Sequence, residues 1–395
     1  MIKRKKKNKE HNPFYDPTLK KRHVSAKRFK KFTLTSLIFS VAFLAFFLFD
    51  MIGKGIPAFN IAYVKVDVTF NEKTLEDTRF AVPTAYRNLV SRAALRDLPK
   101  LLEENPTYMN STQNIWILAS SQVDQYIKNH NHNLKDKDIA KVDELYAQGL
   151  IDKKFNAIFF ENGDSKIPEY AGIFSAVIGS ILTLIITMAV AFPIGVMTAI
   201  YLEEFAGDNK FTRFIEININ NLAAIPSILF GLLGLAIFIN LFGMPRSSPL
   251  VGGLTLALMT LPIIIVSSRA ALRAVPDSIR QAGYGLGLNK IQVTRDHVLP
   301  LAFPGIMTGS IIGLAQAMGE TAPLIIIGMI AFIPDAPSMV TQAATVMPAQ
   351  LFTWAGMPEG MYIEKTAAGI LVLLTILISL NAIAIFLRKK LEVKW

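Results

Sequence analysis

Six long apolar stretches constrain this chain more than any other feature of its sequence. A helix needs about 20 mostly apolar residues to cross the hydrocarbon core of a bilayer. Residues 298–319, which enter the fifth stretch, contain no Asp, Glu, Lys or Arg. The six predicted spans cover residues 32–52, 171–201, 215–242, 250–268, 302–333 and 367–387. We therefore predict an all-α polytopic membrane protein with six transmembrane helices.

Composition agrees with a membrane class. The chain is 52% hydrophobic and only 18% charged, whereas soluble globular proteins carry about 25% charged residues. It has no cysteine, which excludes disulfides, thiol nucleophiles and cysteine metal sites. The absence of cysteine leaves the compartment open.

The net charge of +11 is concentrated at the N-terminus. Residues 1–31 contain thirteen Lys or Arg and two acidic residues, and the rest of the chain is balanced. A basic tail next to an apolar run is typical of a cytoplasmic anchor under the positive-inside rule. The segments 202–213, 269–299 and 388–395 carry two, five and four basic residues. We therefore predict that both termini are cytoplasmic, and we disfavour nucleic-acid binding because no aromatic residues are interleaved with the charges.

Between the first two spans lies a predicted external insert, residues 53–170. Its fifteen basic and sixteen acidic residues nearly cancel. The alternation in "IAYVKVDVTF" (61–70) predicts a half-buried strand, and "FNAIFF" (155–160) is a candidate second strand. Helical periodicity covers 82–102 and 136–150, so the insert is predicted to be a small α+β domain. His130 and His132 suggest a metal site, but no partner ligands recur at useful spacing and a solvated loop is the favoured interpretation.

The predicted cytoplasmic loop, residues 269–300, contains a glycine-rich helical segment. Asp277 or Ser278 is a plausible helix N-cap after Pro276. The glycines at 283, 285 and 287 each weaken a helix by about 1 kcal/mol relative to alanine. A helix so weakened indicates a surface that needs a docking partner, although close packing of the glycines is an alternative.

This loop resembles the EAA loop of ABC importer permeases. The family pattern is Glu-Ala-Ala, three residues, Gly, nine residues, then Ile-x-Leu-Pro. Three positions depart from that pattern: Gln281 replaces Glu, Gly283 replaces Ala, and His297 replaces Ile. The positions that align with the pattern, departures included, are Gln281, Ala282, Gly283, Gly287, Leu299 and Pro300. The resemblance implies a coupling helix that sits in a groove of an ATPase subunit, without the contact that the family's carboxylate makes.

Further strings resemble the phosphate-specific ABC permeases of the PstA type. They are "AFPIGVMTAIYLEEFA" (191–206), "IPSILFGLLGLAIF" (225–238) and "MGETAPLIIIG" (318–328). The likeness runs from about residue 171 to the C-terminus and implies a permease core over residues 171–395. Together with the segments described above, this gives four predicted domains: a basic tail (1–31), an anchor (32–52), the insert (53–170) and the permease core.

This resemblance implies a permease subunit for ATP-driven import of inorganic phosphate across the inner membrane. The partners it implies are a homologous second permease, two ATP-binding subunits and an external phosphate-binding protein. The chain itself would be no enzyme and carry no cofactor, since it lacks a GxxxxGK[ST] motif and ATP would be bound by a partner. Alternatives are import of another oxyanion, sulfate or molybdate, or a membrane-anchored sensor acting through its insert.

Glu320 is the one acid in an otherwise uncharged region of the fifth span. Three interpretations stay open: a structural residue satisfied by its neighbours, a residue that lines the translocation path or pairs with a basic residue of the partner permease, or a proton relay. On a continuous helix Gln316 would share its face, at a position where similar permeases carry Arg. The candidates for the pathway are Glu320, Gln316, Thr321, Asn218 and Asn221.

Overall fold

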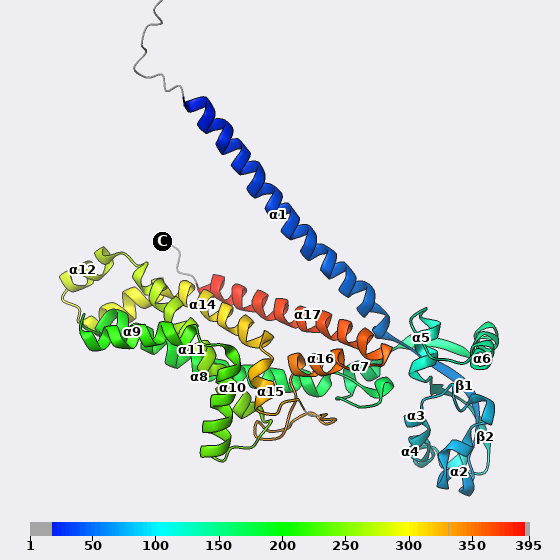
Figure 1. Ribbon diagram of the computed structural model, residues 1–395. Helices are drawn as coiled ribbons and strands as arrows, with labels where there is room; N and C mark the ends of the chain where they lie inside the picture. The colour runs from blue at the N-terminus through cyan, green and yellow to red at the C-terminus, as the bar shows by residue number, and fades with distance from the viewer. Residues whose placement is uncertain (1–17, 331, 392–395) are drawn as a thin grey trace, which may run out of the picture. The chain divides into compact units, whose positions relative to one another are not determined.

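The computed structural model describes residues 18–330 and 332–391 (Figure 1). The chain divides into two compact units, Met1–Gly53 and Lys54–Trp395, and each is described by itself. The predicted basic tail lies outside the described residues from 1 to 17, and so do residues 392–395 of the last predicted cytoplasmic segment.

The first unit consists of most of helix α1 (Leu19–Gly55). The helix begins at Leu19 rather than at residue 32, and its 37 residues extend about 55 Å at 1.5 Å per residue. That length exceeds the hydrocarbon core of a bilayer, about 30 Å. Large apolar side chains such as Phe39 and Phe46 are more than 70% exposed. Helix α1 therefore confirms an apolar helix over the predicted anchor and continues it through the basic residues before it.

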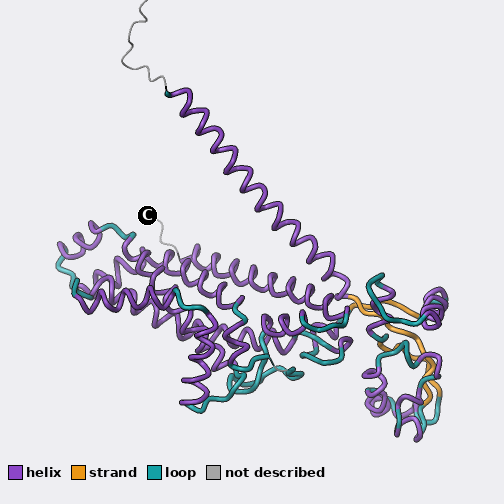
Figure 2. The backbone as a smooth tube through the Cα atoms, in the orientation of Figure 1, coloured by secondary structure: helices purple, strands orange, loops and turns teal. Residues whose placement is uncertain are grey.

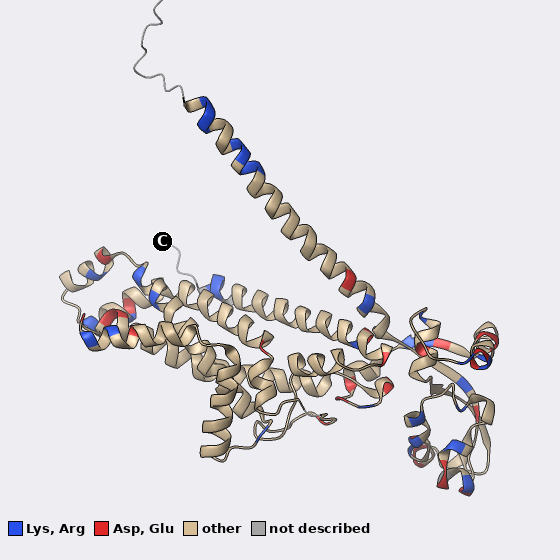
Figure 3. Cartoon of the chain, viewed as in Figure 1, with Lys and Arg blue, Asp and Glu red and all other residues tan. Residues whose placement is uncertain are grey.

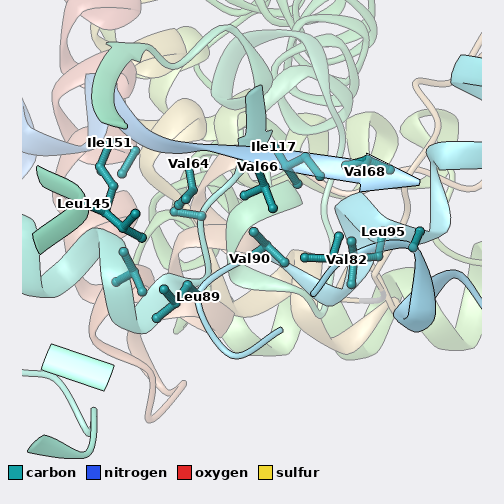
Figure 4. Packing of buried hydrophobic residues seen from close by; sticks show 14 of the residues in the cluster. Val64, Val66, Val68, Val82, Leu89, Val90, Leu95, Ile117, Leu145 and Ile151 are labelled. Atoms are coloured by element: carbon teal, nitrogen blue, oxygen red, sulfur yellow. The ribbon is translucent and has the colours of Figure 1, made fainter. Parts of the chain in front are cut away.

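The insert is built on a three-stranded antiparallel sheet in the order β2-β1-β3, drawn in orange in Figure 2. The strands are β1 (Asn60–Thr69), β2 (Thr112–Leu118) and β3 (Ile151–Phe155). In the central strand, Val66 pairs with Ile115 and Val64 with Ile151. Alternate residues of β1 are buried, because successive side chains of a strand point to opposite faces. Figure 4 shows Val64, Val66 and Val68 packed toward Leu89, Val90 and Leu95, which confirms the predicted half-buried strand.

Six short α-helices complete the insert, and they correct two predictions. The strand predicted for residues 155–160 is wrong: Phe155 ends β3, and Asn156 then accepts a hydrogen bond from the Phe159 N–H and caps a helix. The predicted helix 82–102 is interrupted, since Ser91 caps a new helix. The bounds are α2 (Glu72–Glu76), α3 (Arg92–Arg96), α4 (Leu98–Glu104), α5 (Ser121–Ile127), α6 (Asp136–Ala147) and α7 (Ala157–Glu161). Helix α6 confirms the prediction for 136–150, while β2 and β3 were not predicted.

The remainder of the chain forms a helical core. Its α-helices are α8 (Phe174–Ile200), α9 (Lys210–Ala223), α10 (Ser227–Leu233), α11 (Pro249–Arg273), α12 (Asp277–Gly285), α13 (Lys290–Val293), α14 (Leu299–Gly319), α15 (Ala322–Ile326), α16 (Met347–Ala355) and α17 (Gly360–Leu391). Three π-helical segments join them: η6 (Tyr201–Phe205), η7 (Gly234–Leu241) and η8 (Thr294–Val298). Across the described residues, α1 included, five helices are long and apolar enough to cross a membrane. The number is six if the bent pair of α9 and the α10–η7 segment is counted as one span.

Helix α11 lies at the centre of the core, between α8 and α14. Small residues permit the close approach: a Cβ on Gly253 would lie 2.6 Å from Ile186 of α8, and one on Gly309 of α14 would lie 1.9 Å from the Ser267 hydroxyl. Close backbone approach at small residues is how helices associate where surrounding lipid removes the hydrophobic drive. Along these helices Figure 3 shows almost no charged residues, which agrees with the predicted spans.

The third predicted span is wrong as a single helix. Helix α9 and the α10–η7 segment are bent by 106° with respect to each other. Pro226 is the N-cap of α10; it lacks an N–H and disfavours helical backbone in the residue before it. The chain therefore turns sharply where hydropathy alone predicts one continuous helix over 215–242.

The fifth predicted span is also wrong beyond Gly319, where α14 ends. Glu320 has extended backbone (φ −75°, ψ 129°), and the short helix α15 follows. Gly328, with φ +100°, then turns the chain away. Residue 331 of this predicted span lies outside the described residues. Helix α17 confirms the sixth span and extends it at both ends.

Candidate functional site

Helix α12 forms at the glycine-rich segment of the predicted coupling loop. It begins at Asp277, and its N-cap is Pro276 with no side-chain hydrogen bond, so neither predicted capping residue is the cap. Gly283 is buried, and a Cβ there would lie 2.8 Å from Val293. Gly287 has φ +79° with open space around it, which is the left-handed backbone that commonly ends a helix at glycine. Close packing thus explains one glycine, and backbone conformation explains another.

The outer face of α12 and the segment after it is apolar and exposed. Tyr284 is 44% exposed, Leu286 80% and Ile291 64%; these three residues are called the apolar face below. Gln281 and Ala282 are exposed as well, whereas Leu299 and Pro300 are half-buried at the start of α14. Exposed apolar clusters of this kind mark interaction surfaces. Our sequence analysis singled out none of these three residues, although all lie inside the loop it identified.

Arg280 ties α12 to the helices beneath it. Its guanidinium donates to the Glu204 carboxylate at 2.7 Å and to the backbone oxygens of Leu272 and Val275 at 3.0 and 2.8 Å. Glu204 is buried within η6, and its hydrogen bond raises the pKa of Arg280. A buried carboxylate is costly unless it is paired in this way. Displacement of α12 is therefore opposed by contacts to both η6 and the end of α11.

A second charge network joins three helix ends beside Arg280. Glu203 accepts hydrogen bonds from Arg269 at 3.3 Å and from Arg273 at 2.7 Å. Arg269 also pairs with Glu216 of α9. The predicted cytoplasmic loops 202–213 and 269–299 therefore lie at one end of the core, where Figure 3 shows blue and red segments together beside α12.

Glu320 lies at the break between α14 and α15. Its side chain is half-buried, and within residues 18–330 and 332–391 its carboxylate makes no hydrogen bond or ion pair. Gln316 is exposed on the last turn of α14, while Thr321 is half-buried just before α15. Because the helix ends between them, Gln316 and Glu320 are not stacked on one continuous helical face as we predicted.

The two candidate asparagines lie on α9, away from that break in the chain. Both side chains are exposed, and the Asn218 amide donates to the Phe214 backbone oxygen at 2.8 Å. In the described residues no hydrogen bond joins Asn218 or Asn221 to Glu320. The five candidates thus occupy two places, the last turns of α9 and the α14–α15 break. Their predicted role in a pathway stays a prediction.

The family comparison bears on most of the helical core. The model of the binding-protein-dependent transport system inner membrane component matches residues 191–393, just over half of the chain. The chain belongs to this family. A second model, a domain of unknown function, matches residues 16–85 and 81–136, which contain α1 and much of the insert.

Several curated relatives of the chain carry the name phosphate transport system permease protein PstA, among them one from Mycobacterium leprae and one from Yersinia pestis. The one from Mycobacterium leprae is 36% identical over 160 residues, covering 40% of this chain and 52% of that protein. The one from Yersinia pestis is 31% identical over 245 residues, covering 61% and 81%. The chain spans about half the length of several curated relatives it matches. An inward-facing structure of the MetNI methionine ABC transporter aligns with 56% of this chain and 94% of that chain, at 14% identity and a TM-score of 0.43.

A buried charged junction joins the insert to the core of this family member. Lys365 of α17 is 1% exposed, and its ammonium donates to the backbone oxygens of Pro168, Glu169 and Ala171 at 2.6, 3.3 and 2.7 Å. The adjacent Glu364 accepts hydrogen bonds from two insert residues, as described next. Our sequence analysis did not single out Lys365. The signal that was available was an acid–base pair next to a long apolar run.

The insert side of the junction is helix α5 and the residue after it. The Glu364 carboxylate accepts from the Gln125 amide at 2.6 Å and from the Lys128 ammonium at 2.7 Å. Lys128 also lies 2.7 Å from the Asp124 carboxylate, whose pKa is raised by burial and lowered in part by that ammonium. Four charged groups are therefore buried together with mutual compensation, as burial of charge requires.

The two histidines predicted to belong to a loop lie beside this junction. His130 Nδ1 is 3.5 Å from the Glu364 carboxylate, and the His132 ring makes an edge contact with Tyr126. Across the described residues, no group of three or more His, Cys, Asp or Glu side chains is placed to hold a metal ion.

Proposed function

We propose that this chain is the membrane-spanning subunit of an ATP-driven importer that carries inorganic phosphate across the inner membrane. The observation that carries the proposal is the 31% identity to a phosphate transport system permease over 81% of that relative's length. The string "GETAPL" (319–324) supports the phosphate class over permeases for other oxyanions. The basic segments support a topology with both termini in the cytoplasm.

The proposed complex contains four kinds of subunit. Beside this chain we place a homologous second permease, two subunits that bind ATP, and an external phosphate-binding protein. The chain would hold no cofactor, because ATP would be bound by the partner subunits. Glu320, half-buried and without a partner in the described part of the chain, would pair with a donor from the second permease or line the path between the two.

Helix α12 would transmit closure of the ATP-binding subunits to the core. The apolar face (Tyr284, Leu286 and Ile291) would enter a groove of such a subunit. Movement of α12 would then reach η6 and α11 through Arg280, whose guanidinium bonds to Glu204 and to two backbone oxygens. The route needs no contact from Gln281, where related loops carry Glu.

The deciding experiment is uptake of labelled phosphate by cells that express the complete transporter and lack other phosphate importers. We expect uptake that excess sulfate or molybdate does not reduce. Equal competition by either anion would overturn the phosphate assignment and favour a broader oxyanion importer.

Docking is tested separately by Leu286→Asp, which places a charge on the apolar face without a packing clash because Leu286 is 80% exposed. Met339→Asp is the matched control, since Met339 is 63% exposed in the loop that contacts the start of α11 rather than its end. We expect the first variant to lose copurification of the ATP-binding subunit and the second to retain it. Retention by both would contradict the assigned surface.

A further inference from the structure

Two neighbouring concavities on the insert share a wall of hydrogen-bond donors. One has a volume of about 610 Å³ and the other about 700 Å³, within the range of about 300–1,000 Å³ that ligand sites occupy. Four residues line both: Arg87, Asn88, Arg92 and Arg96. Each of these side chains can donate hydrogen bonds. The carboxylates at the two concavities belong to other residues: Asp138 and Glu169 line the first, and Asp77 lines the second.

The arginines of the insert gather at this wall. The insert as a whole has fifteen basic and sixteen acidic residues, so its net charge does not predict a positive surface. Yet all four of its arginines line the second concavity, and none of its lysines does. Arginine rather than lysine is the residue suited to bidentate binding of oxyanions, because its five donors form a rigid planar fork.

Three of the four guanidinium groups have no carboxylate partner in the described residues. Arg79 is the exception, since both oxygens of Asp77 bind it. Arg87 is held over the Phe80 ring at 4.9 Å and donates only its Nε, to the Val82 backbone oxygen.

Arg92 and Arg96 have no hydrogen-bonding or ionic partner in the described residues. They lie four apart on α3 and are both exposed. Like charges at this spacing are unfavourable in a helix. A bound ligand that carries negative charge would neutralise this repulsion, which favours binding of an anion.

We propose that Arg87, Asn88, Arg92 and Arg96 form a binding site for a phosphate group on the insert. A tetrahedral dianion presents enough oxygens for more than one guanidinium fork and balances more of the local charge than a carboxylate does. Lys166, from the segment before α8, also lines the first concavity. A bound anion would therefore connect α3 to the 166–169 segment, whose last residues Lys365 holds. The site does not depend on phosphate being the transported substrate.

The test measures equilibrium binding of labelled inorganic phosphate to the full chain in a detergent and a buffer that both lack phosphate. A second arm measures binding of labelled glycerol 3-phosphate under the same conditions. The double variant Arg92→Gln/Arg96→Gln is compared with Lys100→Gln/Lys137→Gln. The control removes the same charge from exposed positions of the insert that line neither concavity. Ionic strength is held constant, because exposed charges are screened by salt.

We expect the arginine variant to lose at least tenfold in affinity for one of the two probes, while the control binds as the unaltered chain does. Loss for inorganic phosphate assigns a free anion, and loss for glycerol 3-phosphate alone assigns a phosphate ester. Equal affinity of the two variants for both probes would overturn the site, and so would equal competition by acetate. Both variants share the same core, so any phosphate that binds in a translocation path contributes equally to both measurements. The difference in affinity between the variants can therefore be interpreted even if the chain transports no phosphate.

Discussion

Replacing Lys365 by methionine should destabilise the protein by about 3 kcal/mol. Methionine keeps an apolar stem of similar length but removes the ammonium that three backbone oxygens accept. Hydrogen bonds to charged groups contribute about 1.5–3 kcal/mol each, and two of the three are short, at 2.6 and 2.7 Å. We take the lower bound for those two and neglect the third, at 3.3 Å, because water that enters the junction would recover part of the loss.

The assay is thermal unfolding of the full chain in detergent, followed by tryptophan fluorescence. The fluorescence of Trp354 reports on this region, because its ring lies 5.9 Å from the ring of Tyr362 near the start of α17. A loss of about 3 kcal/mol corresponds to a drop in Tm of about 4 °C, because the entropy of unfolding of a chain of 395 residues is about 0.8 kcal/mol per K. Lys389→Met, at an exposed position on the same helix, is the control for charge. Equal melting temperatures for the two variants would refute the argument that the buried ammonium holds the junction.

Three further predictions concern the break, the coupling helix and a buried acid. Glu320→Gln should lower phosphate uptake by about tenfold, equivalent to about 1.4 kcal/mol, with assembly of the complex intact as judged by copurification. Gly287→Val should raise ATP hydrolysis per transported phosphate, because φ +79° costs a residue with a side chain about 1–2 kcal/mol. Burial raises the pKa of Asp164 to about 6 against a hydrogen bond from Trp354. Ionisation of Asp164 therefore favours the unfolded state. As the pH rises from about 4 through 6, the Tm of the unaltered chain should fall relative to the Tm of the Asp164→Asn variant.

Each of these predictions has a clear contrary result. Unchanged uptake in the Glu320 variant would reduce that residue to a structural role. Normal coupling in the Gly287 variant would show that α12 does not need its present ending; Gly285→Val, where no positive φ applies, is its control. Parallel pH profiles for the two Asp164 forms would contradict the linkage between its burial and stability.

Hydropathy predicted which segments are apolar helices but not where they break. Continuous apolar composition located α8, α11 and α17 because a bilayer-length run has no other stable solution. Hydropathy did not predict the bend at Pro226 or the end of α14 before Glu320, because the residues on both sides of each break are equally apolar. Composition cannot distinguish a helix that continues from one that turns and resumes in the same environment.

The candidate site divides in a similar way. The spacing around Gly283 and Gly287 located the coupling segment, since local backbone requirements are written in local sequence. The contact from Arg280 to Glu204 joins residues 76 positions apart, and no spacing rule reaches across that separation. The apolar face was missed for another reason: exposure is decided by what packs beneath a helix, not by the helix itself.

The buried pairing at the start of α17 bears on how the insert could have been acquired or lost. Glu364 belongs to the segment that the transport family shares, yet its donors Gln125 and Lys128 belong to the insert. A relative without the insert would leave this carboxylate without those donors, which proteins seldom tolerate in a buried position. We therefore expect homologues that lack the insert to carry an uncharged residue at the position of Glu364. Those that have the insert should keep Glu364 together with a donor at the end of α5, so that the two regions have changed together during evolution.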